Sequence, residues 1–314
     1  MNIPPSVTLI DVSARDGLQN EPEILSPAQR AELVERVSAS GVPEIEFGSF
    51  VSPKAVPQMA GADEVFKTAV RSPAVRYHGL VPNMKGYENA VAAGVTHVRL
   101  VVAASAPLHE ANFRRTIDES LADHAQIVAR ARQDGVQIEA VIGGSFGDPF
   151  VGPTPVSAVM HCVDHYYAIG VRNISVADTV GMGTPKQVAE VIKTIQRTYP
   201  DVTLGTHFHD TRNTGFANVL TALDLGVVRH DASLGGTGGC PFAPKAGGNI
   251  CLEDLVHMLT GMGVETGIDL DALIESARWL QEVLGKPLPS RMLKAGPVYP
   301  VFKPVTAAPA AASS

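Results

Sequence analysis

NISVADTVGMGTPKQVAEVIKTIQRTYPDVTLGTHFHD, residues 173–210, contains a complete strand–helix–strand unit. A short β-branched run at Asn173–Val176 precedes a helical pattern at Pro185–Tyr199, and a second strand pattern follows at Thr203–His207. Thr184 before Pro185 is typical of a helix start, because a hydroxyl caps free backbone N–H groups and proline fits the first turn. Two strands joined by a helix of this length indicate a parallel βαβ unit.

Strand and helix patterns alternate in the same way along nearly the whole chain. Six further strands are expected at Val7–Val12, Glu44–Phe47, Val75–Leu80, His97–Val102, Gln137–Ile142 and Arg229–Ala232. Further helices are expected, among other places, at Pro27–Ser40, Ile117–Asp134, Val156–Ile169 and Asn218–Leu225. Eight successive strand–helix units predict an α/β fold of the (β/α)₈ type, a TIM barrel. A doubly wound open sheet is the alternative, but neither glycine-rich phosphate loop of the nucleotide-binding folds follows a strand.

The length and composition favour one domain. A chain of 314 residues suits a single barrel, and no internal stretch has the composition of a linker. We expect one domain over residues 1–303, with a C-terminal helical extension at about 265–303 that includes a helix at Asp269–Leu284. Residues 304–314 are rich in Ala, Pro and Ser, which predicts a disordered tail.

The composition also limits partners and location. The chain carries 25 basic and 32 acidic residues, and this net charge of −7 argues against a general nucleic-acid binder. No apolar run approaches the ~20 residues of a membrane span, and no secretory signal pattern is visible at the start. Three cysteines make no disulfide framework, so Cys162 and Cys251 are predicted to be buried apolar residues. We expect a cytoplasmic protein.

Unusual polar residues follow the predicted strands, at the end of a barrel where catalytic groups collect. The first strand runs directly into a segment that holds Arg15, Asp16 and Gln19. Later strands and their loops supply Glu46, Ser49, Asn83, Ser175, Asp178 and Thr179. The uncharged members of this set are the candidates for binding a substrate: Gln19, Ser49, Asn83, Ser175 and Thr179.

His207 and His209 are the strongest single signal of a metal site. Side chains two residues apart on a strand point to the same face, about 6.5–7 Å apart along the chain. A pair of hydrogen-bonded structural histidines is the alternative, but the acidic groups expected from the first and sixth strands favour a metal. Two imidazoles with oxygen ligands suit Mg²⁺ or Mn²⁺, and Asp16 and Asn249 are natural oxygen ligands to complete the site.

Arg15 and Cys240 are the remaining candidates for chemistry. The planar, permanently charged group of Arg15 suits an oxygen that gains negative charge in a reaction, and a structural ion pair with Asp16 or Glu46 is the alternative. Cys240 follows a glycine-rich segment, which predicts either a plain flexible connection or a loop that closes over a bound molecule. In the second case Cys240 would be a general acid; the residues alone do not distinguish this role from a spectator thiol.

Several longer motifs resemble the 3-hydroxy-3-methylglutaryl-CoA lyase family. They extend from the first predicted strand to the loop after the eighth, so the resemblance covers nearly the whole chain. The motifs are Arg15-Asp16-Gly17-Leu18-Gln19-Asn20-Glu21, Ser49-Phe50-Val51-Ser52-Pro53-Lys54, Pro82-Asn83-Met84-Lys85-Gly86, Asp178-Thr179-Val180-Gly181, His207-Phe208-His209-Asp210 and Gly238-Gly239-Cys240-Pro241-Phe242.

The resemblance implies a metal-dependent lyase on a TIM barrel. The reaction it implies is a retro-Claisen cleavage of 3-hydroxy-3-methylglutaryl-CoA into acetyl-CoA and acetoacetate, which makes the chain an oxo-acid lyase. At the matching positions Arg15 would stabilise the acetyl-CoA enolate, Cys240 would donate a proton, and Glu46 and Asp178 would shape the site. A homo-oligomer, dimer or higher, is also expected. The implied ligands of Mg²⁺ or Mn²⁺ are Asp16, His207, His209 and Asn249.

The chain departs from this family near the expected substrate. The family usually has a cysteine after the fifth strand, in a Gly-Cys-Pro-Tyr-Glu setting, where this chain has Ser145–Val151. Ser105–Glu110 also differs from the family's pattern after the fourth strand, and His78 replaces an apolar residue. Since substituents of the substrate could lie at these places, the acyl group stays open. The alternative substrates are citramalyl-CoA, cleaved to acetyl-CoA and pyruvate, and a longer-branched 3-hydroxyglutaryl-CoA.

Two other functions of the same fold compete with a lyase. A condensing synthase would form the carbon–carbon bond, but such synthases often carry a regulatory domain after the barrel and this chain has only a short extension. A non-catalytic acyl-CoA binder is disfavoured because the expected metal ligands, Arg15 and Cys240 are all present.

The role of Cys240 can be tested by replacing it with alanine. If the thiol gives the proton to the departing carbanion, Cys240→Ala lowers kcat by about 10²- to 10⁴-fold, the usual contribution of a general acid. KM for the acyl-CoA changes little, because the proton is transferred only in the transition state. Steady-state kinetics measures both constants, and a kcat close to that of the unmodified enzyme refutes the role.

Overall fold

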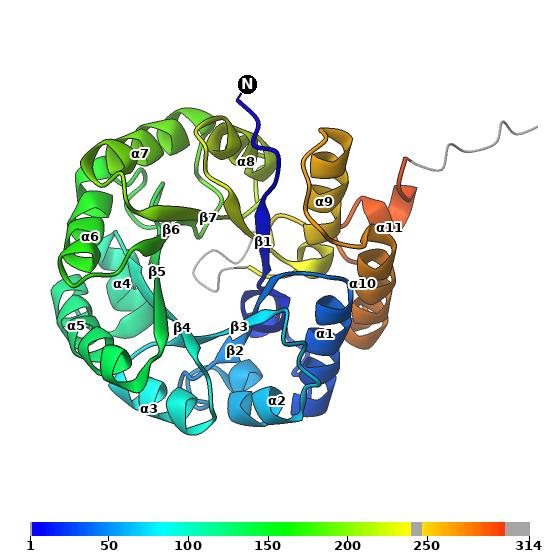
Figure 1. The fold of residues 1–314 in the computed structure, drawn as a ribbon, viewed down its shortest axis with the longest axis horizontal. Helices are drawn as coiled ribbons and strands as arrows, with labels where there is room; N and C mark the ends of the chain where they lie inside the picture. The colour runs from blue at the N-terminus through cyan, green and yellow to red at the C-terminus, as the bar shows by residue number, and fades with distance from the viewer. Residues whose placement is uncertain (1, 240–246, 299–314) are drawn as a thin grey trace, which may run out of the picture.

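The computed structural model describes residues 2–239 and 247–298 and shows eight parallel strands closed into a barrel (Figure 1). β1 pairs with both β2 and β8, so no strand edge is left at the point of closure, and the open-sheet alternative is excluded. The strands are β1 (Thr8–Asp11), β2 (Glu44–Ser49), β3 (Arg76–Val81), β4 (His97–Ala103), β5 (Gln137–Gly143), β6 (Asn173–Asp178), β7 (Thr203–Phe208) and β8 (Arg229–Ala232).

Helices form the outer ring around this barrel (Figure 1). All eight predicted strands are confirmed, with ends that differ by at most two residues. Asp178, for example, still belongs to β6 because it pairs with Phe208 of β7. The helices are α1 (Pro27–Ala39), α2 (Ala62–Thr68), α3 (Met84–Ala92), α4 (Ala106–Phe113), α5 (Ile117–Asp134), α6 (Val156–Ala168), α7 (Pro185–Thr198), α8 (Gly215–Asp224), α9 (Leu252–Gly261), α10 (Leu270–Leu284) and α11 (Met292–Ala295).

Local signals in the sequence set the helix ends. Thr184 accepts a hydrogen bond from the backbone N–H of Gln187, whose side chain bonds back to Thr184, so α7 begins with a capping box. Gly135 ends α5 in the left-handed conformation, with φ of 72°, which residues other than glycine adopt only at a cost. These contacts explain why the α5 and α7 patterns were readable from sequence.

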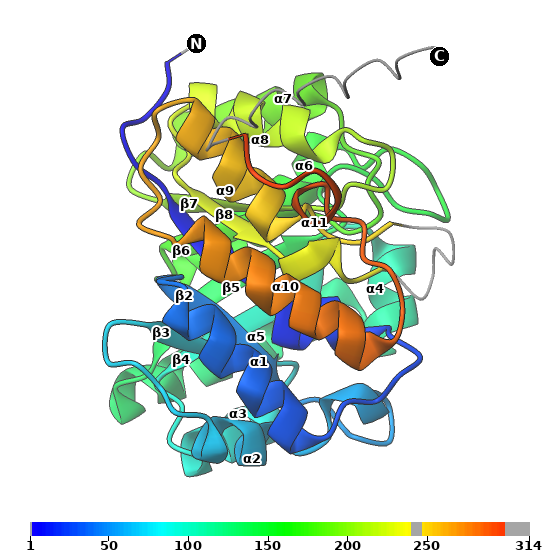
Figure 2. The same cartoon turned by 90° about the vertical axis from the view of Figure 1, so that its right-hand side faces the viewer.

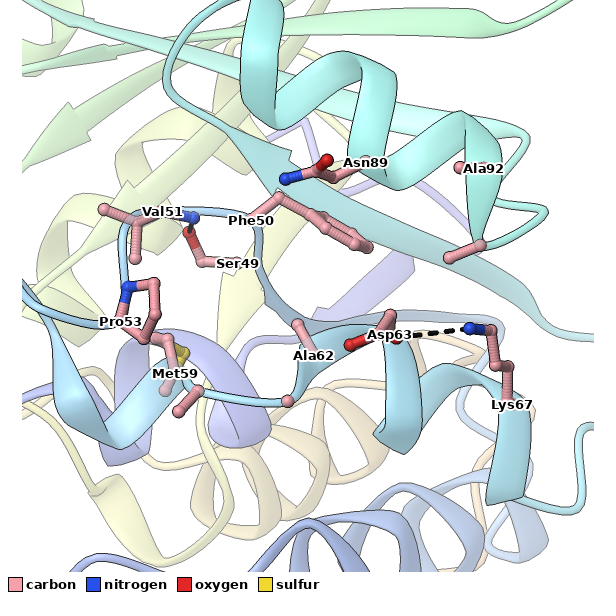
Figure 3. A pocket seen from close by; sticks show the side chains of 13 residues that line it. Ser49, Phe50, Val51, Pro53, Met59, Ala62, Asp63, Lys67, Asn89 and Ala92 are labelled. Carbon is pink, nitrogen blue, oxygen red and sulfur yellow. Dashed lines mark hydrogen bonds and ion pairs between the residues drawn. The ribbon is translucent and has the colours of Figure 1, made fainter.

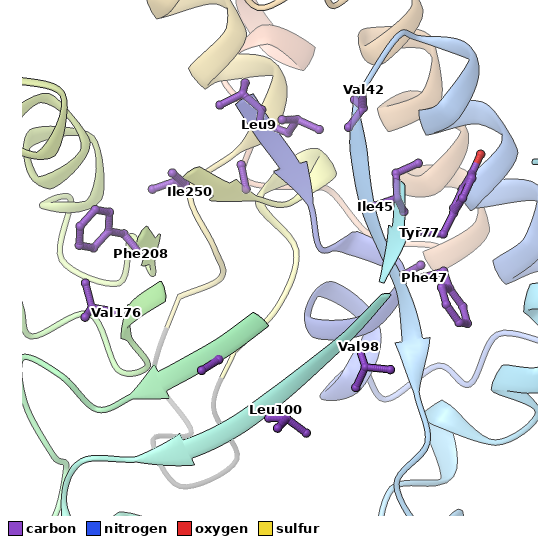
Figure 4. Packing of buried hydrophobic residues seen from close by; sticks show 14 of the residues in the cluster. Leu9, Val42, Ile45, Phe47, Tyr77, Val98, Leu100, Val176, Phe208 and Ile250 are labelled. Atoms are coloured by element: carbon purple, nitrogen blue, oxygen red, sulfur yellow. The ribbon is translucent and has the colours of Figure 1, made fainter. Parts of the chain in front are cut away.

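The apolar core lies between the barrel and its helices (Figure 4). Val98 and Leu100 of β4 are fully buried and point outward toward the helical layer, as do Phe47 of β2 and Val176 of β6. Because strand side chains alternate, the residues between them point into the lumen of the barrel. Burying a side chain of this size stabilises the fold by about 1.5–3 kcal/mol, which makes this layer the main source of stability.

Charged side chains occupy the part of the lumen near the N-terminal ends of the strands, called the lower lumen below. Arg229 of β8 bonds to Glu44 of β2 and to Glu139 of β5, at 2.6 and 3.1 Å. Strands β8, β2 and β5 are not all neighbours in the barrel, so these side chains can meet only across its interior. TIM-barrel interiors are more often filled by branched apolar residues, and here paired charges take that place.

The C-terminal helices cover the outside of the barrel beside α1 (Figure 2). α10 lies along α1, and the guanidinium of Arg36 is 4.8 Å from the ring centroid of Trp279. The predicted helical extension is therefore present, whereas the predicted tail at 304–314 falls outside the described residues. Among the residues that the structure describes, no helix is both long and apolar enough to cross a membrane.

Candidate active site

The predicted metal ligands meet at the C-terminal mouth of the barrel. Asp16 follows β1. His207 lies in β7, next to its C-terminal residue, and His209 directly follows the strand. The Asp16 Oδ2 atom is 3.8 Å from His207 Nε2 and 3.3 Å from His209 Nε2, and the two imidazole centroids are 5.3 Å apart. One ligand atom from each of these residues lies within 4.8 Å of the others, a spacing that one ion can bridge.

Asn249 completes the group with an oxygen atom. Its Nδ2 donates to Asp16 Oδ2 at 2.8 Å and to the carbonyl of Thr237 at 3.0 Å. Its Oδ1 is buried and has no hydrogen-bond partner among the described residues, and the same is true of His209 Nδ1. A buried acceptor without a partner is costly in a folded protein. Binding of a cation would satisfy Asn249 Oδ1, so the donor set fits a hard divalent metal.

Neighbouring charged groups keep Asp16 ionised and orient the ring of His207. Burial alone would raise the pKa of Asp16, but the adjacent Arg15 and the two imidazoles hold that pKa well below its ordinary value. His207 Nδ1 donates to Asp231 Oδ2 at 3.0 Å, which leaves Nε2 directed toward Asp16. A carboxylate behind a histidine fixes the ring's tautomer and orientation, as is common for metal-ligating histidines.

Arg15 is held by carboxylates on two sides. Its Nε donates to Glu46 Oε1 at 2.5 Å, and its Nη1 donates to Asp16. These charges outweigh the effect of burial, and the pKa of Arg15 is raised. Arg15 therefore forms ion pairs with both Asp16 and Glu46, the structural alternative considered for it from the sequence. It also lines the large pocket described below. Glu46 itself is buried and acts on the pocket only through Arg15.

A single wide helical turn, Ser13–Gly17, carries Arg15 and Asp16 from β1 to the mouth of the barrel. Gly17 is needed here because the turn packs against the loop after β8. A Cβ atom on Gly17 would lie 2.5 Å from Thr237 Oγ1 and 2.6 Å from Ser233 Oγ. The glycine therefore lets the two segments that carry Asp16 and Asn249 approach each other.

A pocket of about 1300 Å³ opens directly over this cluster. Four of the predicted substrate-binding residues line it: Gln19, Ser49, Asn83 and Thr179. Its lining also includes four basic residues besides Arg15, namely Lys54, Arg114, Arg115 and Lys286. The chain as a whole has a net charge of −7. This local excess of positive charge suits an elongated anionic ligand.

Ser175 and Asp178, like Glu46 and Asn249, do not line the pocket. Ser175 donates to Glu139 Oε1 at 3.1 Å, deeper in the lumen, and does not line the cavity. Asp178 accepts from the backbone N–H groups of Met182 and Gly183 and so shapes the loop after β6, while burial raises its pKa. The geometry therefore supports a structural role for both residues, because Ser175 bonds within the barrel lumen and Asp178 bonds to the loop after β6.

In the stretches that depart from the resembled family, Leu108 lines the large pocket, whereas the polar residues Ser105, His109 and Asp148 do not. Asp148 accepts from Ser105 and from the backbone N–H of Leu108, which ties the loop after β5 to the start of α4. His109 accepts from the N–H of Ala103 at 3.1 Å, and burial lowers its pKa to about 4. His78 bonds to Glu44 in the lower lumen. The polar side chains of these stretches therefore bond within the scaffold, and Leu108 is the member of Ser105–Glu110 that reaches the pocket.

Cys240 lies outside the described residues, so the structure does not test its position. Gly238 and Gly239, just before it, line the pocket. A Cβ on Gly238 would lie 2.5 Å from Asn249 Nδ2, and its φ is +117°. This first part of the glycine-rich segment is thus packed tightly against the candidate metal ligands, which argues against a plain flexible connection there.

Asp231 and Arg99 were missed by the sequence reasoning. Asp231 holds His207, and Arg99 pairs with both Asp231 and Glu46. Their signal was a charged residue inside an otherwise apolar or short strand, at a position that alternation places in the lumen. A buried charge in such a place requires a partner, but the sequence does not show which partner it meets.

A second cavity of about 380 Å³ lies outside the barrel, between α2, α3 and the loop after β2 (Figure 3). The charged residues at its edge, Asp63 and Lys67, pair with each other at 3.1 Å. It shares Ser49 and Val51 with the large pocket but contains none of the candidate metal ligands. We therefore assign the chemistry to the large pocket.

The closed barrel with an aspartate, two histidines and an arginine at its mouth defines a TIM-barrel enzyme with a candidate divalent-metal centre. Residues 6–280 match the HMGL-like family, and the chain belongs to it. An (R)-citramalyl-CoA lyase of Chloroflexus aurantiacus is 50% identical, with 94% of this chain and 96% of that protein covered. A hydroxymethylglutaryl-CoA lyase of Bacillus subtilis is 36% identical, covering 94% of this chain and 98% of the relative.

A solved structure of a related enzyme confirms the fold. An HMG-CoA lyase of Acinetobacter baumannii, in complex with coenzyme A and 3-methylmalate, superposes with a TM-score of 0.91 at 42% identity, covering 95% of this chain and 98% of that one. The resemblance inferred from the motifs is therefore confirmed, as is the class of enzyme, a CoA-ester lyase among the oxo-acid lyases.

His207→Ala tests the metal centre without relying on turnover. The change removes one ligand atom, so we expect the affinity for Mn²⁺ to fall by more than the roughly 10- to 100-fold that losing an outer contact to a ligand costs. Isothermal titration with Mn²⁺ measures this, and circular dichroism checks the fold. His161→Ala, an exposed histidine paired with Asp118, is the control and should bind Mn²⁺ normally. Unchanged Mn²⁺ affinity in His207→Ala would refute the site.

Gly17→Ala tests the close approach of the two loops. The added methyl group collides with Thr237 and Ser233, so we expect a loss of stability of about 1–3 kcal/mol, typical of overpacking, together with weaker Mn²⁺ binding. Gly261→Ala is the matched control, because nothing lies within 4 Å of a Cβ there. Denaturant unfolding and Mn²⁺ titration measure the two effects; equal stability of both variants contradicts the packing argument.

Proposed function

We propose that this enzyme cleaves (R)-citramalyl-CoA into acetyl-CoA and pyruvate. The observation that carries the choice of substrate is the 50% identity to an (R)-citramalyl-CoA lyase, against 36–38% for the hydroxymethylglutaryl-CoA lyases of Bacillus subtilis and Bos taurus and 42% for the solved HMG-CoA lyase of Acinetobacter baumannii. The sequence motifs favoured 3-hydroxy-3-methylglutaryl-CoA, with citramalyl-CoA and a longer-branched 3-hydroxyglutaryl-CoA as alternatives. The two substrates differ by one methylene group, and the comparisons favour the shorter one.

A ligand of a related structure points in the same direction. The Acinetobacter baumannii enzyme was solved with coenzyme A and 3-methylmalate, a five-carbon branched hydroxydicarboxylate. Its acid is an isomer of citramalic acid, which is 2-methylmalic acid. A site of this shape therefore has room for a branched malyl group, and the bound coenzyme A supports an acyl-CoA ester as the substrate of the present chain.

The donor set supports Mg²⁺ or Mn²⁺ at Asp16, His207, His209 and Asn249. Such an ion, when bound, lowers the pKa of the C3 hydroxyl group and orients the substrate's oxygens. Arg15 lines the pocket and carries a permanent charge, so it can neutralise the enolate oxygen that forms when the C2–C3 bond breaks. Glu46 and Asp16 keep the guanidinium at that place. Cys240 is proposed as the group that then protonates the enolate carbon.

The basic rim would hold the coenzyme A part. The chain as a whole repels an anion, so local cations must attract the phosphates. Arg114 and Arg115 lie at the end of α4, and Lys54 lies in the loop after β2; all three line the pocket. Lys286 also lines it and pairs with Glu21. Cytoplasmic location and a homo-oligomeric state stay predictions.

A product assay distinguishes the candidate substrates. With Mn²⁺ or Mg²⁺ present, we expect pyruvate from (R)-citramalyl-CoA with a kcat/KM about 10- to 200-fold above that for 3-hydroxy-3-methylglutaryl-CoA, the discrimination that one methylene group usually supports. Coupled assays for pyruvate and acetoacetate measure the rates, with a chelated sample as control. Faster formation of acetoacetate would assign the enzyme to the longer substrate, and tight binding without any turnover would make it a binder.

A further inference from the structure

Arg99 bonds to two carboxylates, Glu46 and Asp231, that lie in the barrel lumen beneath the active site. It lies in the middle of β4, and its side chain is fully buried. Its Nη1 atom is 2.9 Å from Glu46 Oε2 and 2.9 Å from Asp231 Oδ2, and its Nη2 atom is 3.0 Å from Asp231 Oδ1. β4 and β8 lie on opposite sides of the barrel, so this guanidinium spans the lumen.

Each of the two carboxylates also holds a residue at the mouth of the barrel. Glu46 accepts from Arg15, through Nε at 2.5 Å and Nη2 at 3.3 Å. Asp231 accepts from His207 Nδ1 at 3.0 Å, on the same oxygen that faces Arg99 Nη1. One nitrogen atom of Arg99 is thus two hydrogen bonds away from both Arg15 and a candidate metal ligand.

The charge of Arg99 is required to keep these carboxylates in place. Glu46 and Asp231 are both buried, and without Arg99 the side of each carboxylate that faces the lumen would lose its cationic partner while staying out of water. Burial would raise the pKa of Asp231, but Arg99 and His207 hold it below its ordinary value. The planar fork of arginine can meet two acceptors at once in fixed directions, which the single ammonium of lysine cannot.

We propose that Arg99 is a positioning residue: it fixes Glu46 and Asp231 so that Arg15 and His207 are aligned for the same reaction. It touches neither the pocket nor a candidate ligand, so it acts only through these carboxylates. The inference rests on the proposed function for its effect on turnover, whereas its effect on metal binding is independent of the substrate.

Arg229 offers a matched control inside the same lumen. It is also mostly buried, and it pairs with Glu44 and with Glu139. Arg99 likewise contacts Glu139, at 2.8 Å, so both arginines take part in one network. None of the described contacts of Arg229 reaches Glu46 or Asp231. Loss of Arg229 therefore reports the effect of removing a lumen arginine that has no contact with Glu46 or Asp231.

The experiment compares Arg99→Lys with Arg229→Lys in the full-length protein. Both changes keep the charge, which favours folding, but lysine cannot reproduce the fork. For Arg99→Lys we expect Mn²⁺ affinity and kcat each to fall by about 10- to 100-fold, the range for outer contacts of metal sites, with KM for the acyl-CoA changed less than about threefold. For Arg229→Lys we expect a lower melting temperature with Mn²⁺ affinity and kcat within about twofold of the unmodified enzyme.

A double-mutant cycle with Asp231→Asn checks the route of the effect. If Arg99 acts through Asp231, the loss of Mn²⁺ affinity in the double variant is much smaller than the product of the two single losses. Normal Mn²⁺ affinity in Arg99→Lys overturns the proposal, as do equal losses in both arginine variants. If the unmodified enzyme cleaves no hydroxyacyl-CoA, the proposed function fails, while the Mn²⁺ comparison still decides the role of Arg99.

Discussion

Paired charges across the barrel lumen are the constraint on which the rest of this structure depends. Arg99 and Arg229 meet carboxylates from β2, β5 and β8, and the pairs are shielded from water. A buried ion is tolerated only when its partners are in place, because removing one partner leaves an uncompensated charge. The strands on opposite sides of the barrel are therefore held in one relative arrangement. Apolar side chains would fill the same space but would not fix the directions of polar groups above them.

The active site is built directly on this layer. Glu46 and Asp231 belong to the lumen network on one side, and on the other they hold Arg15 and His207. The site is thus oriented by strands, which move less than loops, and preorganised groups of this kind need little rearrangement during a reaction. The loops after β1 and β8 add Asp16 and Asn249, and their close approach depends on Gly17.

Membership of the HMGL-like family identifies the class of enzyme but does not identify the acyl group of the substrate. The loop residues that differ most visibly in sequence, Ser105, His109 and Asp148, bond to one another's loops and to backbone N–H groups. They stabilise the scaffold around the pocket and do not line it. Selection between substrates that differ by one methylene group therefore belongs to the side chains of the pocket wall, which include Leu108 of the altered stretch after β4 but not these three polar residues.

Much of the fold and part of the site could be predicted from the chain alone. Strand alternation, capping hydroxyls and terminal glycines are local signals, so the eight βα units and the His207–His209 pair were readable without a structure. The partners of buried charges were not, because Arg99 and Asp231 are 132 positions apart and meet only when the barrel closes. The same reason separates Ser175 from Thr179. Ser175 lies in β6 and Thr179 directly after it, but only the closed barrel places Ser175 away from the pocket and Thr179 in its wall. Sequence determined which chemical groups are present, and tertiary structure decided which of them face each other.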